Sequence, residues 1–571
     1  MKKKYQERII PCLLFAVYWV RILFLDADTK CFRLSEVQPI DEMYHSELAI
    51  NIIRYGLKGV LDGTWSNLSI ANAKTFLIPS LITSVFMKVF GYNFWGFKLS
   101  NAFIGFVTGV LLYKIIKIIV PGKRGIHWCV LAAYIFDFNV FMLSREAVTM
   151  IPCAFACLVL TCILLLVNRT SLKWFLAGFW CVLSFCAIYM GMPFFFIATI
   201  IILLISSIVE KEKFILNALF YSAGMGAGVL LCECLSRIFF QQHVIKTISD
   251  TMAAQNDKIS DGGVLSLLIK SVDNIFDYWC SNAFRYNYLS LITSWFAICI
   301  LIHGIIKYKD RVSLILVCII ISHWAQTIVL KNMTPSKSTI TYPIIILAIG
   351  YAFFRYCYGD YQIDERTSKV LINLSYVLVL FGLFLFFKSS QPIEKKLLCI
   401  EYCVAIISAF GLIVFIGLRK RYLLISCVAM SCAFMAFLSF YYALYNPTYT
   451  DREMLIDLGK QTNNGMLING TGLSLYNYCK SPANVYDHYK GAGYDYDTMW
   501  KSMVDACYEY DELYYVGYYE DNEWNVSRLM ERLDNTGYSF EEIARYRRAY
   551  GAASQWDHTE DQILYKKVCR P

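Results

Sequence analysis

The sequence predicts an α-helical polytopic membrane protein with about thirteen transmembrane helices, outer helices at the membrane interface and a small C-terminal α/β domain outside the membrane. Three observations favour this fold class. Hydrophobic residues make up 57% of the 571 residues, and the mean hydropathy is +0.47. Charged residues reach only 17%, below the roughly 25% usual in soluble domains. Finally, residues 446–571 carry a net charge of −7 within a chain of +9, so the apolar part is strongly cationic.

The apolar stretches are numerous and long enough to span a bilayer. A helix crosses the hydrocarbon core with about 20 apolar residues. The first stretch runs into Asp26-Ala27-Asp28 and lacks a small-x-small cleavage site, so we expect a permanent anchor. The thirteen stretches that we interpret as spans lie near residues 9–25, 99–119, 126–143, 147–167, 173–190, 192–209, 214–235, 289–307, 312–330, 339–357, 368–388, 397–418 and 421–443.

The basic residues predict the orientation of the spans. Cytoplasmic loops carry an excess of Lys and Arg, and the chain begins with Lys2, Lys3, Lys4 and Arg8. Every alternate loop counted from there is basic, which leaves the C-terminus outside. The outer loops 331–338 and 388–396 also carry lysines, so the pattern has exceptions. We expect a multi-pass plasma-membrane protein, and the basic excess then needs no nucleic-acid partner.

Three outer regions are large enough to carry chemistry. Residues 1–445 form the predicted membrane domain, with outer loops 26–98 and 236–288, and residues 446–571 form the predicted outer soluble domain. Within the first loop, residues 75–90 are apolar but short, as expected of a helix lying in the interface. In the tail, residues 465–469 and 513–519 resemble strands, and residues 451–461 and 523–533 resemble helices.

The 21 cysteines do not predict a metal or redox site. Most lie within apolar stretches, and none forms a CxxC pair, so they are interpreted as small hydrophobic residues. Cys479, Cys507 and Cys569 lie in the tail, where one disulfide could form.

An acidic pair, Asp41-Glu42, follows the first span. Carboxylates in hydrocarbon cost roughly 2.5–3.5 kcal/mol each on insertion scales, so this pair must face water or a polar cavity. The pair could be a solvated loop end that begins a helix. Alternatively, one carboxylate could act as a general base towards an acceptor hydroxyl. His45 lies one helical turn after Asp41, and together they could hold a divalent cation, although one His beside one Asp is weak support.

Three cations lie on the same outer side. Lys74 precedes the short apolar helix, Lys98 precedes the second span, and Arg145 follows the third. Each could be an interfacial side chain that snorkels to water. As a group they would suit a phosphate. Less specific candidates for substrate contacts on the outer side are Tyr44, His45, His243, Arg285, Tyr286, Tyr288, Lys331 and Lys337.

These elements resemble glycosyltransferase family 39 and its GT-C superfamily relatives, which include protein O-mannosyltransferases and the lipid A aminoarabinose transferase. In that family an Asp-Glu pair follows the first span, then come an apolar helix ending in Phe-Gly and a basic residue in an Arg-Leu-Pro-like segment. The corresponding motifs here are Asp41-Glu42, Phe90-Gly91 and Lys98-Leu99-Ser100, with Ser144-Arg145 after the third span and a Pro-containing entry at 338–350. Lys98 replaces the commoner arginine and Ser100 the commoner proline. The resemblance covers roughly residues 9–350.

The resemblance implies transfer of a sugar from a polyprenyl-phosphate donor to a glycan, lipid or protein acceptor, on the outer face and with inversion. It implies Asp41 as general base, Glu42 as support or metal ligand, and Lys74 and Arg145 at the donor phosphate with help from Lys98. The family's lysine usually precedes Pro or Gly, whereas Lys74 precedes Thr75. The alternatives are a lipid or polysaccharide transporter or flippase, a lipid-linked polysaccharide ligase or polymerase, and a non-catalytic receptor or assembly factor.

Overall fold

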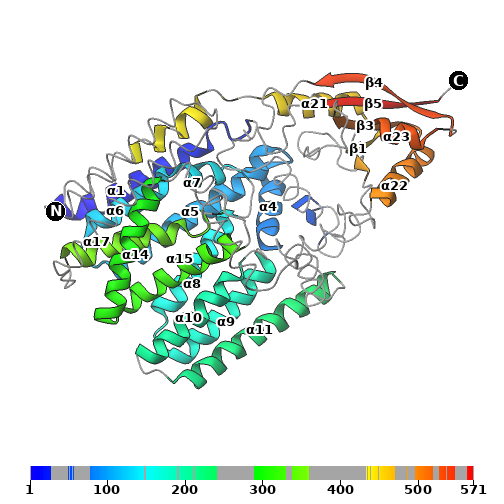
Figure 1. Cartoon of the computed structure of the whole chain (residues 1–571). Coiled ribbons are helices and arrows are strands. Elements are labelled where there is room, and N and C mark those ends of the chain that lie inside the picture. Colours follow the sequence, from blue (N-terminus) through cyan, green and yellow to red (C-terminus); the bar gives the residue numbers. More distant parts are fainter. Residues whose placement is uncertain are drawn as a thin grey trace, which may run out of the picture.

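A computed structural model of the whole chain gives the arrangement of the elements. It describes residues 2–27, 49–50, 52–53, 56, 77–146, 150–188, 192–209, 213–240, 288–329, 337, 339–358, 432–433, 435–437, 439–445, 447, 449–469, 485–486, 496–518, 526–534, 536–546 and 562–569. Figure 1 shows the strands and the last helices gathered at one end of the molecule, with the long apolar helices filling the rest.

The apolar part of the chain is helical, as predicted. The first ten predicted spans each coincide with helix, whereas the stretches 368–388, 397–418 and most of 421–443 lie outside the described residues. The helices are α1 (Lys2–Tyr18) with the 3-10 turn η1 (Trp19–Ile22), α5 (Phe94–Ile119), α6 (Arg124–Phe136), α7 (Phe138–Leu143), α8 (Met150–Leu166), α9 (Thr170–Ala187), α10 (Phe194–Val209), α11 (Phe214–Phe240), α14 (Tyr288–Tyr308), α15 (Arg311–Val329) and α17 (Tyr342–Tyr358). A short π-helical turn, η3 (Phe440–Leu444), precedes the C-terminal part.

Length and composition qualify only some of these helices as spans by themselves. Among the described residues, three helices are long and apolar enough to cross a membrane, namely Phe94–Ile119, Thr170–Ala187 and Phe214–Ile238. Eight further apolar helices have 10–17 residues. The chain is therefore a helical membrane protein, and the total of thirteen spans stays a prediction.

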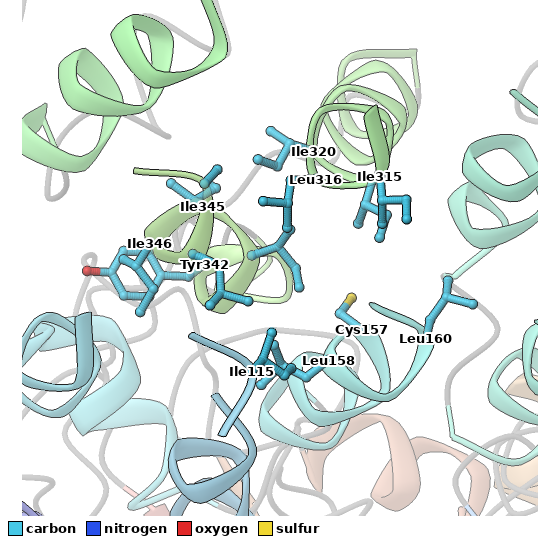
Figure 2. Packing of buried hydrophobic residues seen from close by; sticks show 14 of the residues in the cluster. Ile115, Cys157, Leu158, Leu160, Ile315, Leu316, Ile320, Tyr342, Ile345 and Ile346 are labelled. Carbon is cyan, nitrogen blue, oxygen red and sulfur yellow. The ribbon is translucent and has the colours of Figure 1, made fainter. Parts of the chain in front are cut away.

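The core of the helical part lies where α5, α8, α15 and α17 meet. Figure 2 shows Leu158 of α8 beside Ile115 of α5, and on the other side of the cluster Leu316 of α15 and Ile345 of α17. All four side chains are buried. Lipid tails are as apolar as these side chains, so close packing rather than transfer out of water must hold the helices together. The four helices thus form a fixed frame for the segments at their outer ends.

One predicted span is broken into two helices. A single helix was expected over residues 126–143, but α6 ends at Phe136 and α7 begins at Phe138. Asp137 lies between them in extended conformation, and its carboxylate accepts a hydrogen bond from the backbone N–H of Val140 at 2.8 Å. Asp favours this N-cap role because its side chain satisfies a helix donor that lacks a partner. The break redirects the chain towards the turn that carries Arg145.

The short apolar helix of the first outer loop is present as α4 (Leu77–Phe90) and packs against α5. Thr83 and Ser100 join the two helices through a hydroxyl hydrogen bond of 2.9 Å. Gly91 ends α4 at φ +92, a backbone conformation that other residues rarely adopt. The Asn93 side chain then accepts a hydrogen bond from Gly96 N at 2.8 Å and caps α5. The Phe-Gly and Asn residues therefore build the tight corner that leads to Lys98.

The C-terminal part is a mixed five-stranded sheet with helices on both faces. Its elements are α21 (Thr450–Thr462), β1 (Met466–Asn469), β2 (Val485–Tyr486), α22 (Tyr496–Glu509), β3 (Leu513–Tyr518), α23 (Val526–Arg532), β4 (Tyr538–Tyr546) and β5 (Gln562–Cys569). The strand order is β2-β1-β3-β5-β4. The pairs β2–β1 and β1–β3 are parallel, and the pairs β3–β5 and β5–β4 are antiparallel.

Successive side chains of β3 pack on opposite faces of this sheet. Tyr515 packs with α22 and α23, whereas Tyr514 and Val516 pack with α21. This alternation is the period of two expected of a buried strand. Both predicted strands and both predicted helices of the tail are present, although the strands β2, β4 and β5 and the helix α22 were missed. The boundary near residue 446 stays a prediction.

Candidate functional site

Lys98 and Arg145 lie within the described part of the chain, as do two of the less specific candidates, Tyr288 at the start of α14 and Lys337. The other predicted residues lie outside it, and their positions stay predictions: Asp41, Glu42, Tyr44, His45, Lys74, His243, Arg285, Tyr286 and Lys331. The same holds for the cation-binding pair Asp41 and His45. Among the described residues, no group of three or more His, Cys, Asp or Glu side chains could hold a metal ion.

Arg145 is buried in the turn between α7 and α8. Its guanidinium donates hydrogen bonds to the backbone carbonyls of Arg21, Leu23 (2.8 Å) and Phe24 (3.0 Å). Burial lowers the pKa of Arg145 to about 10, and the nearby Glu146 carboxylate opposes that shift. The side chain therefore stays positively charged at neutral pH. Its planar guanidinium binds the backbone carbonyls where the chain leaves the first helix.

Lys98 is also buried, one turn inside α5, with only 3% of its surface exposed. Its ammonium donates a hydrogen bond to the carbonyl of Ala27 at 3.1 Å. The same nitrogen lies 4.6 Å from the centre of the Phe94 ring, within the range of a cation–π interaction. Lys98 thus contacts the backbone only three residues beyond the last carbonyl that Arg145 contacts.

A third cation, Arg21, belongs to this group and was not predicted from the sequence. It is completely buried in η1. Its guanidinium donates to Ser144 Oγ at 2.7 Å and to the Ile135 carbonyl at 2.9 Å, and it lies 3.5 Å from the centre of the Tyr18 ring. An arginine at the end of an apolar stretch was a usable signal, since charged side chains there require partners.

These contacts converge on residues 21–27, which we call the α1 exit. Backbone hydrogen bonds between residues three apart form turns in it, including Leu25 N to Ile22 O at 3.2 Å and Ala27 N to Phe24 O at 3.0 Å. Arg452 of α21 adds a contact from the C-terminal part, an ion pair with Asp26 at 2.6 Å. The exit is therefore held by cations from three separate elements.

Two of the three predicted outer cations, Lys98 and Arg145, do come together, but around a backbone segment. The fork of Arg145 and the ammonium of Lys98 both donate to carbonyls of the α1 exit. Both cations are buried in a low-dielectric setting, where their charges are weakly screened. The loop that contains Asp41 and Glu42 starts directly after this exit. The arrangement can therefore fix where that loop begins and supply positive potential beside it.

Ionisable residues within the apolar helices have local partners. Glu233 of α11 accepts a hydrogen bond from Arg237 one turn later, at 2.9 Å. His323 of α15 is buried, and its Nδ1 lies 3.0 Å from the Thr341 hydroxyl.

The tail cysteines give no disulfide between the two that are described. Cys507 and Cys569 are both free thiols, the first buried and the second exposed. Cys479 lies outside the described residues.

Comparisons with known proteins identify the fold. Residues 74–232 match a family model described as dolichyl-phosphate-mannose-protein mannosyltransferase. The crystal structure of ArnT from Cupriavidus metallidurans bound to undecaprenyl phosphate is similar over 98% of this chain and 97% of that chain, with a TM-score of 0.51 and 11% identity. The apo structure of the same protein gives a TM-score of 0.51, with 12% identity over 99% and 98% of the two chains. No curated protein sequence matches at the threshold applied.

These likenesses extend over nearly the whole length of both chains, including the C-terminal part. At such low identity they show a shared fold. The family match begins at Lys74 and also includes Lys98 and Arg145. It therefore spans all three predicted cations without assigning a role to any of them.

Proposed function

We propose that this chain, a GT-C superfamily protein by fold and by the family match over residues 74–232, transfers a sugar from a polyprenyl-phosphate donor to an acceptor hydroxyl. The observation that carries the proposal is this match combined with the full-length fold likeness to a protein crystallised with undecaprenyl phosphate. The orientation predicted from the basic loops puts the reaction on the extracytoplasmic face of the plasma membrane.

The proposed reaction needs one base and several positive charges. The acceptor oxygen attacks the anomeric carbon while the bond from that carbon to the donor phosphate breaks, which inverts the configuration. Asp41 takes the hydroxyl proton as general base, and Glu42 supports it or binds a cation. The departing phosphate leaves as an anion, so positive groups stabilise it better than a proton donor would.

The three outer cations have different parts in this proposal. Lys74 contacts the donor phosphate. Lys98 and Arg145 donate to carbonyls of the α1 exit, so they act mainly as fixed positive charges beside the phosphate. Tyr44, His45, Arg285, Tyr286 and Lys331 are proposed substrate contacts on the same side.

The proposal is tested by replacing the base. We expect Asp41→Asn to abolish sugar transfer while membrane insertion and thermal stability stay at the wild-type level, because the amide cannot accept the proton. The measurement is a lipid and glycan profile of cells that lack the protein and are complemented with either form. Accumulation of a lipid-phosphate sugar with Asp41→Asn would identify the donor.

A matched control uses an exposed carboxylate of the C-terminal sheet domain. Asp497 lies on α22 and forms an exposed ion pair with Arg532 at 2.7 Å, so Asp497→Asn should support a normal profile. Full transfer by Asp41→Asn would contradict the mechanism. A profile that does not change even when the whole protein is removed would contradict the proposed function itself.

A further inference from the structure

We propose that the C-terminal domain positions the first outer loop, because its helix α21 holds the α1 exit through Arg452 and through Phe94. The inference rests on the proposed function in one respect, that the loop beginning at this exit carries the catalytic base. It assigns a role to the soluble domain and to two positioning residues, both within the described part of the chain.

The first contact is an ion pair between distant parts of the chain. Arg452 Nη1 lies 2.6 Å from Asp26 Oδ2. The side chains keep 35% and 24% of their surface exposed, so the pair is partly shielded from water and from salt. A partly exposed ion pair contributes only modest energy to stability. Its role here is to orient α21 relative to the α1 exit. It sets where α21 sits relative to the last residues before the outer loop.

The second contact is an apolar anchor supplied by the membrane domain. Phe94, at the first position of α5, is 7% exposed and belongs to the hydrophobic cluster between α21 and the sheet. The other buried members of this cluster come from α21, β1, β3 and β5: Met454, Leu455, Leu458, Leu467, Tyr514, Val516 and Leu564. The C-terminal domain is thus docked around an aromatic ring that belongs to the other domain.

The same ring contacts the α1 exit through Lys98. The Lys98 ammonium lies 4.6 Å from the ring centre of Phe94 and 3.1 Å from the Ala27 carbonyl. A displacement of the C-terminal domain would therefore pull on the ring, and through Lys98 on Ala27. Arg452 acts on the adjacent residue, Asp26, from the other element. Two independent contacts thus transmit the position of α21 to two consecutive residues of the exit.

The backbone of the α1 exit can respond to a displacement of α21. Residues 23–27 are held by turn hydrogen bonds and not by a continuing helix, including Leu23 N to Val20 O at 3.1 Å and Ala27 N to Phe24 O at 3.0 Å. Segments with few regular hydrogen bonds open at low free-energy cost. Removing one holding contact should therefore loosen the exit without unfolding the helices around it.

The first experiment measures amide hydrogen exchange of the full-length protein in detergent. We expect Arg452→Glu to increase the exchange rates of the amides of Leu25 and Ala27 by about tenfold, because two carboxylates would face each other. The double variant Asp26→Lys/Arg452→Glu restores the opposite charges and should return the rates towards wild type. The control is Arg532→Glu, which breaks the Asp497 ion pair of 2.7 Å within the same domain and should leave the exit unchanged.

The second experiment separates the two functions of the Phe94 ring. Phe94→Leu keeps an apolar side chain in the cluster but lacks the π-face for Lys98, whereas Phe94→Tyr keeps the ring. We expect Phe94→Leu to raise exchange at Ala27 and to lower sugar transfer by about threefold to tenfold, with Phe94→Tyr close to wild type. The thermal stability of the C-terminal domain should change little in either variant.

The outcomes distinguish the inference from the function on which it rests. If Asp41→Asn abolishes transfer but Arg452→Glu and Phe94→Leu leave both exchange and transfer at wild-type values, the positioning role is wrong and the function stands. If exchange at the exit rises but Asp41→Asn transfers normally, the docking is correct and the proposed base is wrong. Increased exchange together with reduced transfer, restored by the charge swap, supports both.

Discussion

The guanidinium of Arg145 donates hydrogen bonds to three backbone carbonyls of the α1 exit. These hydrogen bonds satisfy both the buried donor and the carbonyl acceptors. A buried guanidinium without partners would be very costly. The carbonyls of Arg21, Leu23 and Phe24 follow the end of a helix, where backbone acceptors lack intrahelical donors. The planar fork of arginine can donate to several oxygens at once, a geometry that lysine cannot reproduce. The pairing therefore depends on the shape of the guanidinium as well as on its charge.

The predicted consequence is that Arg145→Lys is harmful although it conserves the charge. Loss of two of the three hydrogen bonds should lower the stability of the folded protein by about 3–6 kcal/mol, since hydrogen bonds to charged groups contribute about 1.5–3 kcal/mol each. Thermal denaturation in detergent, followed by size-exclusion chromatography, measures the change. The control is Arg237→Lys on α11, where the arginine side chain is 62% exposed and forms an ion pair with Glu233. Equal stability of the two variants would contradict the fork interpretation.

The donor affinity of the same variants tests the electrostatic role proposed for Arg145. With a pKa of about 10, the wild-type side chain is charged throughout the neutral range, so undecaprenyl phosphate binding should not titrate through it below about pH 9. We expect Arg145→Ala to weaken that binding and Arg145→Lys to weaken it less. Affinity for undecaprenyl phosphate can be measured by intrinsic tryptophan fluorescence. Identical affinities in wild type and Arg145→Ala would remove this residue from the donor site.

At the scale of elements, the crossing of α9 and α11 depends on glycine. A Cβ added to Gly224 would lie 2.0 Å from the carbonyl oxygen of Phe175, and one added to Gly178 would lie 2.2 Å from that of Tyr221. Small residues allow helix backbones to approach closely, which is the main source of helix association in membranes. Both helices were predicted from hydropathy, but hydropathy does not tell which face of a helix meets which neighbour. The break at Asp137 was missed for a related reason, since one Asp within an apolar stretch can be a cap or a buried polar residue.

We predict that Gly224→Ala destabilises the protein by about 1–3 kcal/mol, because a methyl group would force the two backbones apart. Gly226 lies two residues further along the same helix, and a Cβ added there would have no atom within 4 Å. Gly226→Ala is therefore a matched control that should be neutral or slightly stabilising. Both variants can be compared by thermal denaturation in detergent and by the fraction that remains monodisperse. A neutral Gly224→Ala variant would mean that α9 and α11 are farther apart than in this structure.

At the scale of the whole molecule, the sequence predicted local elements better than long-range contacts. The helices of the apolar part and the strands at 466–469 and 513–518 follow from hydropathy and periodicity. The strands β4 and β5 were missed because their charged and apolar residues do not alternate cleanly, and the antiparallel partner supplies what the local pattern lacks. The ion pair between Asp26 and Arg452 joins residues from opposite ends of the chain, and no local signal predicts it. The sequence indicated Lys98 and Arg145 as one group, whereas their carbonyl partners could not be predicted.

The orientation of the whole molecule in the membrane is also a prediction. The different accessibility of two cysteines in the C-terminal domain allows it to be tested. Cys569 is an exposed thiol at the end of β5, whereas Cys507 is buried in α22, and burial raises the pKa of the Cys507 thiol to about 12. If thirteen spans place the C-terminus outside, a membrane-impermeant maleimide added to intact cells should label Cys569 and spare Cys507 until the protein is denatured. Peptide mass spectrometry distinguishes the two sites. Labelling of Cys569 only after permeabilisation would place the C-terminal domain inside. Because Arg452 of that domain contacts Asp26 of the α1 exit, the first loop would then begin on the inside as well, and the predicted orientation would be wrong.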